Sequence, residues 1–264
     1  MIQLRNVDFA YGIRPILEDV SFRIDDGESV VVMGPSGSGK STILRLILGL
    51  ECPSRGEVLV DHKSICAMRE KDKRKVRKKI GMVFQDGALF DSMTVGENVG
   101  YYLLEHTRLG WDTITERVRD MIGFVGMNPD EVVDQLPEEL SGGMQRRVAI
   151  GRALLSAEPQ VMLYDEPTTG LDPQSTAQVL SLILKLQNER RVSSIVVTHQ
   201  IADSFAITDR FIVILRGRVV FDGTAEQLRD SDHPGVRKFL DPFKESMSGV
   251  VYRRFASNLQ EGDG

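Results

Sequence analysis

Residues 29–42 read SVVVMGPSGSGKST, an apolar run that passes into a glycine-rich loop and then into a lysine. Residues 34–42 fit the pattern G-x-x-x-x-G-K-[ST], and the apolar sequence KSTILRLILGL follows as a helix would. Glycines let successive backbone N–H groups turn toward phosphate oxygens, and the helix N-terminus adds partial positive charge. The stretch therefore predicts a buried strand, a phosphate-binding loop and a helix.

This loop predicts an ATP site. We expect its nine residues to contact the nucleotide: Gly34, Pro35, Ser36, Gly37, Ser38, Gly39, Lys40, Ser41 and Thr42. Lys40 would reach the β- and γ-phosphates, and the Ser41 hydroxyl would ligate Mg²⁺. Enzymes with such a loop hold the metal with a carboxylate that ends a second strand, and VMLYDEP at residues 161–167 supplies it. Asp165 is the predicted metal ligand, and Glu166 would orient or deprotonate the attacking water.

The remaining pattern predicts an α/β core that is interrupted by helices. Two strand-like runs, residues 2–11 and 16–25, precede the phosphate loop, and KIGMVFQ at 79–85 predicts another strand. Helical periodicity replaces the strand pattern from residue 94 to residue 157. Buried strands and an apolar helix then alternate up to FIVILRGRVVFDG, which predicts a hairpin turning near Arg216 and Gly217.

Composition sets limits on the partners. With 264 residues, 41% hydrophobic content and a formal charge of −5, the chain is an ordinary globular protein without a general basic surface for nucleic acid or anionic membranes. The basic run at residues 69–79 is interpreted as a solvated helix face. Cys52 and Cys66 have neither CxxC spacing nor the density of a disulfide scaffold, so they are interpreted as reduced thiols. No stretch holds ~18 consecutive apolar residues, so we expect no membrane crossing.

A second helix start also has the form of an anion site. In ELSGGMQRRVAIGRAL, residues 139–154, Ser141, Gly142 and Gly143 open a helix. Together with the phosphate loop and DEPTTGLDP, this segment resembles the ATP-binding-cassette (ABC) ATPases over about residues 1–224. The resemblance implies a P-loop NTPase (RecA-like) core, formed by residues 1–86 and 158–224 with an N-terminal antiparallel β subdomain. It also implies an α-helical subdomain inserted at 87–157, a C-terminal extension at 225–264, and a head-to-tail dimer that encloses two ATP molecules.

The resemblance assigns roles to single residues. Tyr11 aligns with the aromatic that stacks on adenine, unless its ring packs in the core. Gln85 aligns with the glutamine that senses the γ-phosphate and Mg²⁺, and His199 with the histidine that contacts the γ-phosphate. Asp172 belongs to the loop that crosses the dimer axis. The implied catalytic residues are Glu166, His199 and Lys40, the implied metal ligands are Ser41, Gln85 and Asp165, and the implied signature contacts to ATP are Ser141, Gly142 and Gly143.

An apolar loop follows Gln85, in VFQDGALFDSMTVGENV at residues 83–99. A surface loop is ordinarily polar, so this one either folds into a core or is covered by something else. In the family, the loop faces the membrane partner. We therefore expect a permease helix to dock against Ala88, Leu89, Phe90 and Met93.

Departures from the common pattern narrow the choice within the family. Met144 stands where LSGGQ has glutamine, which removes a side-chain amide. LSGGM, QDGALFDSMTVGENV and VRKFLD at residues 236–241 resemble ATPases of Mla-type (MCE-associated) phospholipid transporters. These ATPases lie on the cytoplasmic face of the inner membrane, beside a permease, an MCE-type lipid-binding protein and a small accessory subunit.

Other readings stay open. One is the ATPase of an importer for polar amino acids or similar solutes, which shares the catalytic motifs. Another is an ABC protein that acts in translation or on nucleic acid without a permease, although the paired cassettes or long coiled-coil insertions of that class are missing here. The tail aromatics Phe239, Phe243, Tyr252 and Phe255 dock either on a neighbouring subunit or on their own domain.

Overall fold

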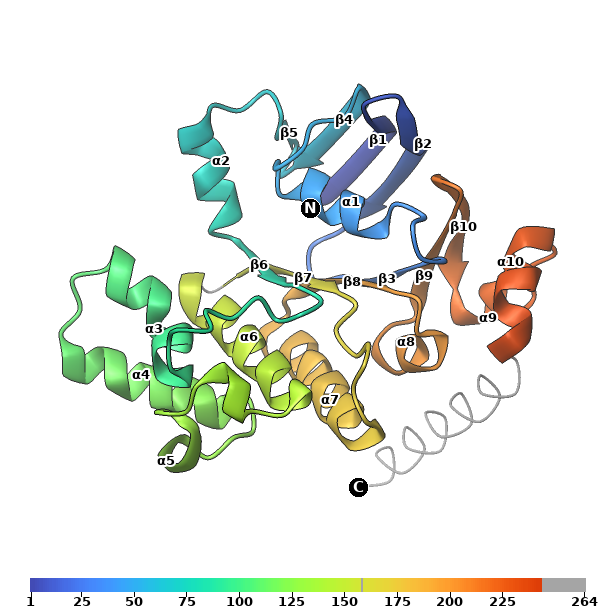
Figure 1. The fold of residues 1–264 in the computed structure, drawn as a ribbon. Helices are drawn as coiled ribbons and strands as arrows, with labels where there is room; N and C mark the ends of the chain where they lie inside the picture. The colour runs from blue at the N-terminus through green and yellow to red at the C-terminus, as the bar shows by residue number, and fades with distance from the viewer. Residues whose placement is uncertain (158, 244–264) are drawn as a thin grey trace. The chain divides into compact units, whose positions relative to one another are not determined.

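A computed structural model describes residues 1–157 and 159–243 of the chain (Figure 1). By its internal contacts the chain forms two compact units. Of the described residues, the first comprises Met1–Met68 and 195–243, and the second lies within Arg69–Ser194. The predicted subdomain boundaries at residues 86/87, 157/158 and 224/225 stay a prediction.

The first unit begins with an antiparallel sheet in the strand order β2-β1-β4-β5. Its strands are β1 (Ile2–Tyr11), β2 (Arg14–Ile24), β4 (Arg55–Val60) and β5 (Lys63–Ser64). The register pairs Ile2 with Ile24 and Leu4 with Phe22, so apolar side chains at every second position share one buried face. Strands β1 and β2 confirm the two strands that were predicted at residues 2–11 and 16–25.

The second sheet of this unit carries the phosphate loop. In the described part of the chain, the sheet has six strands, of which four lie wholly or mostly in this unit and follow the order β10-β9-β3-β8. They are β3 (Ser29–Met33), β8 (Ser193–Thr198), β9 (Arg210–Leu215) and β10 (Arg218–Thr224). Strand β3 is buried and pairs in parallel with β9, with Val30 opposite Arg210. The predicted hairpin turn is confirmed, because Arg216 and Gly217 adopt φ of 50° and 76° between β9 and β10.

Helices complete the first unit. Helix α1 (Lys40–Ile47) follows β3 directly, and its apolar side chains are buried. The later helices are α8 (Ile201–Ile207), α9 (Ala225–Arg229) and α10 (Pro234–Leu240), followed by the short 3₁₀ turn η2 (Asp241–Phe243). Tyr252 and Phe255 lie outside the described residues, so the docking of the tail stays a prediction.

The second unit holds two parallel strands and most of the helices. Strand β6 (Ile80–Val83) pairs with β7 (Val161–Asp165), with Ile80 opposite Val161. The helices are α2 (Glu70–Arg77), α3 (Val95–His106), α4 (Trp111–Phe124), α5 (Pro129–Val132), η1 (Pro137–Glu139), α6 (Gly142–Ala157) and α7 (Pro173–Arg190).

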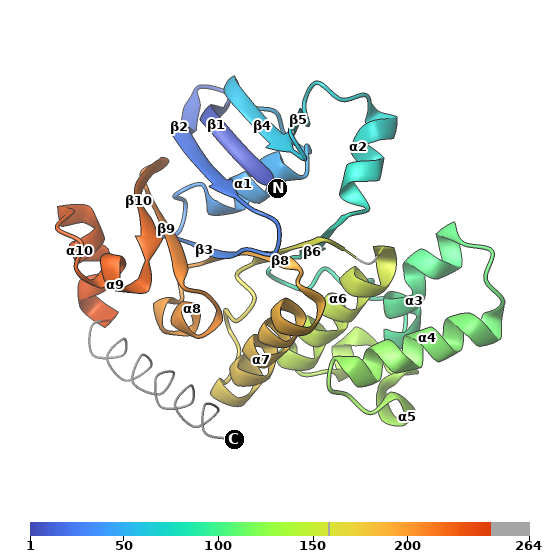
Figure 2. The same cartoon turned by 180° about the vertical axis from the view of Figure 1, so that it is seen from behind.

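Helix α6 is the centre of the helical layer. It contacts α3, α4 and α7, and both views show α6 and α7 side by side (Figure 1, Figure 2). Val148, Ile150 and Leu154 of α6 are buried, as are Val99 of α3 and Ile183 of α7. Helix α3 starts at a capping box, in which Thr94 and Glu97 bond each other's backbone N–H groups. None of the helices within residues 1–157 and 159–243 combines the length and apolar character that crossing a bilayer requires.

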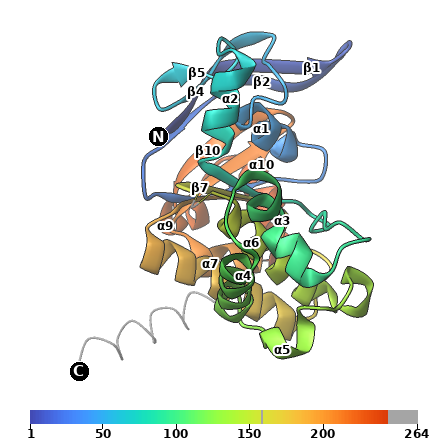
Figure 3. The ribbon, with the colours of Figure 1, turned by 90° about the vertical axis from the view of Figure 1, so that its left-hand side faces the viewer.

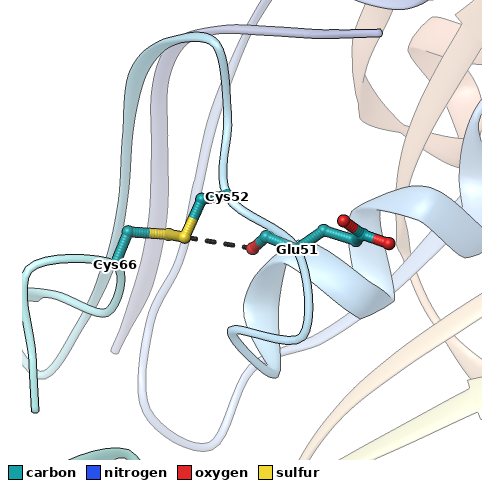
Figure 4. Close-up of a disulfide and its surroundings, with 3 residues drawn as sticks. All are labelled: Glu51, Cys52 and Cys66. Carbon is teal, nitrogen blue, oxygen red and sulfur yellow. Dashed lines mark hydrogen bonds between the residues drawn. A yellow bond between two sulfur atoms is a disulfide. The ribbon is translucent and has the colours of Figure 1, made fainter. Parts of the chain in front are cut away.

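The cysteine prediction was wrong, because Cys52 and Cys66 form a disulfide (Figure 4). Their Cα atoms lie 5.8 Å apart, a separation that a disulfide spans. The β4–β5 hairpin, which pairs Val60 with Lys63, brings the chain back beside the segment that follows α1. Spacing of 14 residues does not reveal this convergence, since it depends on the hairpin.

Candidate functional site

The phosphate loop is held by close backbone packing in the first unit. A Cβ atom at Gly34 would lie 2.2 Å from the carbonyl oxygen of Ile214, so only glycine fits there. Gly39 has φ of 102°, and a Cβ atom there would lie 2.5 Å from Leu17. Lys40 is buried, and its Nζ donates to the carbonyl oxygens of Gly34 at 2.8 Å and Pro35 at 3.3 Å. The ammonium group is thus folded back over the loop that it belongs to.

The loop has the donors that a phosphate group needs. Pro35, Ser36 and Gly37 are exposed, whereas Ser38 is buried. Within the described residues, the Ser38 hydroxyl has no hydrogen-bond partner, although a buried polar group ordinarily has one. Ser41 and Thr42 open helix α1 at its positive end. These features fit an anionic ligand such as the phosphates of ATP.

Tyr11 lies beside the same helix. Its ring packs edge to face on Phe9, with the centroids 4.8 Å apart, and Arg45 of α1 donates to its hydroxyl at 3.2 Å. The side chain is 42% exposed, so it is not a core aromatic. The adenine-stacking role stays a prediction.

The predicted acid pair lies at the end of β7, in the second unit. Asp165 is half-buried, while Glu166 is buried and accepts a hydrogen bond from the Thr169 hydroxyl at 3.1 Å. Glu166 also has φ of 49°, in the left-handed region that costs a non-glycine residue about 1–3 kcal/mol. Such strain persists where the surrounding structure fixes the side chain for a purpose.

Helix α6, which begins at the signature residues and is called the signature helix below, packs closely on α7. A Cβ atom at Gly143 would lie 2.5 Å from Ser175 Cβ, so the two helices meet at a distance that only glycine allows. Asp172 caps α7 by accepting from the N–H groups of Gln174 and Ser175, both at 3.0 Å. The hydrogen bonds from Ser175 and Gln174 lower the pKa of Asp172. Ser141 and Gly142 are exposed, so an outside ligand can reach them.

Gln145 follows Met144 and carries a side-chain amide, but this amide bonds the backbone of its own chain. Met144 is half-buried, and the next side chain donates from Nε2 to the carbonyl oxygens of Pro137 at 2.8 Å and Leu140 at 3.3 Å. The amide therefore braces the turn before the signature helix. This role of Gln145 cannot be predicted from the motif, because it depends on where the folded chain directs the amide.

The loop after Gln85 is apolar and partly exposed. Phe84 and Phe90 are 42% and 40% exposed, and Ala88 is exposed with φ of 47°. Leu89 and Met93 are half-buried. The Phe90 ring packs on Tyr101, with the centroids 4.7 Å apart. The loop is therefore neither a core segment nor a polar one, which leaves the predicted partner site in place.

Three polar side chains that sequence reasoning missed hold this loop. Asn98 is fully buried and bonds the backbone of Phe90, Met93 and Thr94. Arg152 donates to the carbonyl oxygens of Ala88 at 2.8 Å and Gly87 at 3.0 Å. Arg146 donates to that of Phe84 at 3.5 Å, and burial lowers its pKa. No motif marks these residues, because each role depends on a backbone group that only folding brings to the side chain.

The remaining predicted residues are distributed over the two units. His199 follows β8 in the first unit and is half-buried, and Gln85 is exposed in the second. Of the implied metal ligands, Ser41 belongs to the first unit and Asp165 to the second. Among the residues that the structure describes, no three His, Cys, Asp or Glu side chains cluster as a metal site.

Comparison with known proteins identifies the class. The family model for ABC transporters matches residues 17–169. The dimeric ATP-binding cassette MJ0796, solved in a post-hydrolysis state with ADP and Pi, superposes with a TM-score of 0.77 and 33% identity. The alignment covers 85% of this chain and 98% of that one. The chain belongs to the ABC transporter family, and the predicted P-loop NTPase fold is confirmed.

Named relatives are similar over most of their length. The intermembrane phospholipid transport ATP-binding protein MlaF of Haemophilus influenzae is 38% identical over 91% of this chain and 90% of its own. A probable ribonucleotide transport ATP-binding protein, mkl of Mycobacterium leprae, is 35% identical over 98% of this chain and 74% of its own. The chain is thus an ABC-type ATPase of a family that binds ATP and works as dimers with permease subunits.

Proposed function

We propose that this ATPase powers the movement of phospholipid between bacterial membranes. The observation that carries the proposal is the 38% identity to MlaF of Haemophilus influenzae over nine-tenths of both chains. An identity spread over the whole length supports a shared task better than motifs that every cassette has. The three sequence motifs that resemble Mla-type ATPases support the same choice.

The phosphate loop binds ATP, and the acid pair Asp165 and Glu166 serves its hydrolysis. Lys40 and the loop N–H groups bind the phosphates, and Tyr11 stacks on the adenine. Ser41, Gln85 and Asp165 would hold Mg²⁺, which would supply positive charge to offset the charge that develops on the phosphate oxygens. Glu166 orients the attacking water, and its bond from Thr169 holds the carboxylate in one orientation.

Two copies of the chain work as a head-to-tail pair. Ser141, Gly142 and Gly143 of one copy close over ATP that is bound by the phosphate loop of the other, beside Asp172. Exposure of Ser141 and Gly142 supports this arrangement, since a signature buried in its own chain could not meet a partner's ligand. Closure surrounds the phosphates with fixed dipoles, and hydrolysis releases the pair.

The apolar loop transmits this closure to a permease. A short permease helix packs on Ala88, Leu89, Phe90 and Met93, while Gln85 responds to the γ-phosphate. The backbone bonds from Asn98 and Arg152 support the proposal, because a loop that passes on movement has to be stiff. An MCE-type lipid-binding protein and a small accessory subunit complete the complex at the cytoplasmic face of the inner membrane.

A second candidate is uptake of a polar solute. The relative named for ribonucleotide transport is 35% identical over 98% of this chain, so its similarity also extends over the whole cassette. A polar-solute importer would use the same ATP site and the same loop, so these features do not separate the two functions.

Co-purification separates them. The chain is expressed with its own permease, extracted in detergent, and the bound small molecules are identified by mass spectrometry. Phospholipid in a fixed ratio to the complex, above the level carried by an unrelated permease, is the expected result. Enrichment of a ribonucleotide or amino acid, with lipid at the background level, would overturn the proposal.

A further inference from the structure

Helix α2 is an exposed basic element. Residues 69–79 hold eight basic and two acidic side chains in a protein whose formal charge is −5. None of the eight residues of α2 is buried, so the helix does not owe its place to a packed apolar face. Its two acids are paired already: Asp72 with Arg69 and Lys75, and Glu70 with Arg77. The exposed Lys71, Arg74 and Lys78 remain to give the face its positive charge.

This basic face continues into aromatic side chains of α3. The Lys78 ammonium lies 5.7 Å from the centre of the Tyr102 ring, and that ring packs on His106 with the centroids 4.9 Å apart. His106 is the last residue of α3. Lys78 directly follows α2, so these side-chain contacts connect the basic helix to the end of α3 within the second unit. Helices α3 and α4 form a hairpin, and Figure 3 shows their ribbons together with that of α2.

The tip of that hairpin exposes large apolar side chains. Leu109 in the connecting loop is 36% exposed and Trp111, the first residue of α4, is 69% exposed. Trp111 is also the one tryptophan of the sequence. The hairpin carries the exposed acids Glu105, Asp112 and Glu116, so its contribution is apolar contact and α2 supplies the charge.

We propose that α2 and the tip formed by Leu109 and Trp111 bind the surface of an anionic phospholipid bilayer. Clustered Lys and Arg side chains attract acidic headgroups, and tryptophan prefers the boundary between headgroups and acyl chains. A protein partner with an acidic surface would match the charge as well, and it is the occupant that failure to bind vesicles would favour. The contact holds the ATPase against the membrane independently of the permease. It goes beyond the proposed transport function, which supplies only the presence of a membrane.

The test uses the full-length chain and vesicles, with neither ATP nor permease. Vesicles of equal parts phosphatidylglycerol and phosphatidylcholine are compared with pure phosphatidylcholine by co-sedimentation. We expect binding to the anionic vesicles that weakens as salt is raised. The variant Lys71→Glu/Arg74→Glu/Lys78→Glu should bind ~10-fold more weakly or worse. The matched control Lys63→Glu/Arg229→Glu/Lys238→Glu makes the same charge change on exposed side chains of the first unit and should bind as the unaltered chain does.

Trp111 fluorescence tests the apolar tip. Binding should shift its emission to shorter wavelength, and brominated lipids should quench it. Equal vesicle binding by both triple variants, binding without any change in Trp111 emission, or no binding at all would overturn the proposal. Thermal unfolding by circular dichroism checks that each variant is folded. Failure here leaves the transport proposal intact, since co-purified lipid is measured with the permease present.

Discussion

The Asn98 side chain makes two hydrogen bonds to the backbone of Phe90: its Oδ1 accepts from the Phe90 N–H at 2.8 Å, and its Nδ2 donates to the Phe90 carbonyl oxygen at 3.1 Å. One side chain is fully buried, whereas the other is 40% exposed. The pair therefore separates two roles within the loop, since Asn98 fixes its shape and Phe90 is exposed for the proposed permease contact.

The first prediction concerns Phe90. Phe90→Asp should dissociate or uncouple the permease, because a charge then replaces the apolar anchor at the proposed contact. Stability should fall by only about 1 kcal/mol, the scale of its lost aromatic contact. ATP binding should be unchanged by calorimetry while pull-down with the permease is lost. Asn98→Ala is the comparison, and it should cost about 1–3 kcal/mol because it leaves buried backbone groups unpaired. Unfolding of the Phe90 variant would mean that Phe90 belongs to the core.

The second prediction concerns Glu166. Glu166→Gln should reduce ATP turnover ~10²- to 10⁴-fold, because an amide cannot take a proton from the attacking water. ATP binding should survive, so size-exclusion chromatography with ATP should show a stable dimer. Thr169→Val removes the hydrogen bond that orients the carboxylate and should slow turnover less. Normal phosphate release by the glutamine variant would disprove the assigned role.

The third prediction concerns Lys40. Lys40→Ala should abolish measurable ATP binding in calorimetry, since the ammonium is the main positive charge that the loop offers to the phosphates. The same side chain also bonds the carbonyl oxygens of Gly34 and Pro35, so melting without nucleotide serves as the control. Undiminished ATP affinity in a folded variant would count against the phosphate loop.

The fourth prediction concerns Gly143. A methyl group there meets Ser175, so Gly143→Ala should lower the free energy of unfolding by about 1–3 kcal/mol. Gly123→Ala is the matched control, because Gly123 lies inside α4 with open space around it. That variant should be neutral or stabilising by up to about 1 kcal/mol. Urea denaturation of both proteins measures the difference, and equal effects would contradict the close α6–α7 approach.

The fifth prediction concerns the disulfide. The bond joins two residues that are 14 positions apart and so closes a short loop. Cys52→Ser should therefore lower the free energy of unfolding by about 3 kcal/mol under oxidising conditions. With a reducing agent present, the variant and the unaltered chain should unfold alike. A free-thiol assay on the untreated protein provides an independent check, and two reactive thiols with no effect of reduction would refute the bond.

Local patterns predicted much of this fold. The apolar run before Gly34, the alternation in residues 2–11 and the glycine after Arg216 each determine structure within a few residues, so strands, helix and hairpin follow from them. The disulfide between Cys52 and Cys66 was missed because it depends on how the β4–β5 hairpin returns, which no spacing rule encodes.

The candidate site likewise contains residues that local patterns predict and residues whose roles depend on the folded chain. Lys40, Asp165 and Glu166 could be predicted as site residues because each stands at a fixed offset from a strand end or helix start. Asn98, Arg152 and Gln145 act on backbone groups between 4 and 65 positions away, so their roles appear only when the chain is folded. The strained φ of Glu166 likewise has no sequence signature, since its neighbours do not require it.

Transport itself tests the central claim most directly. The chain and its permease are reconstituted in vesicles that contain fluorescent phospholipid, and transfer to acceptor vesicles is followed with and without ATP. We predict ATP-dependent lipid transfer that is lost with Glu166→Gln. ATP hydrolysis that drives uptake of a ribonucleotide or another polar solute, with no movement of lipid, would contradict the account.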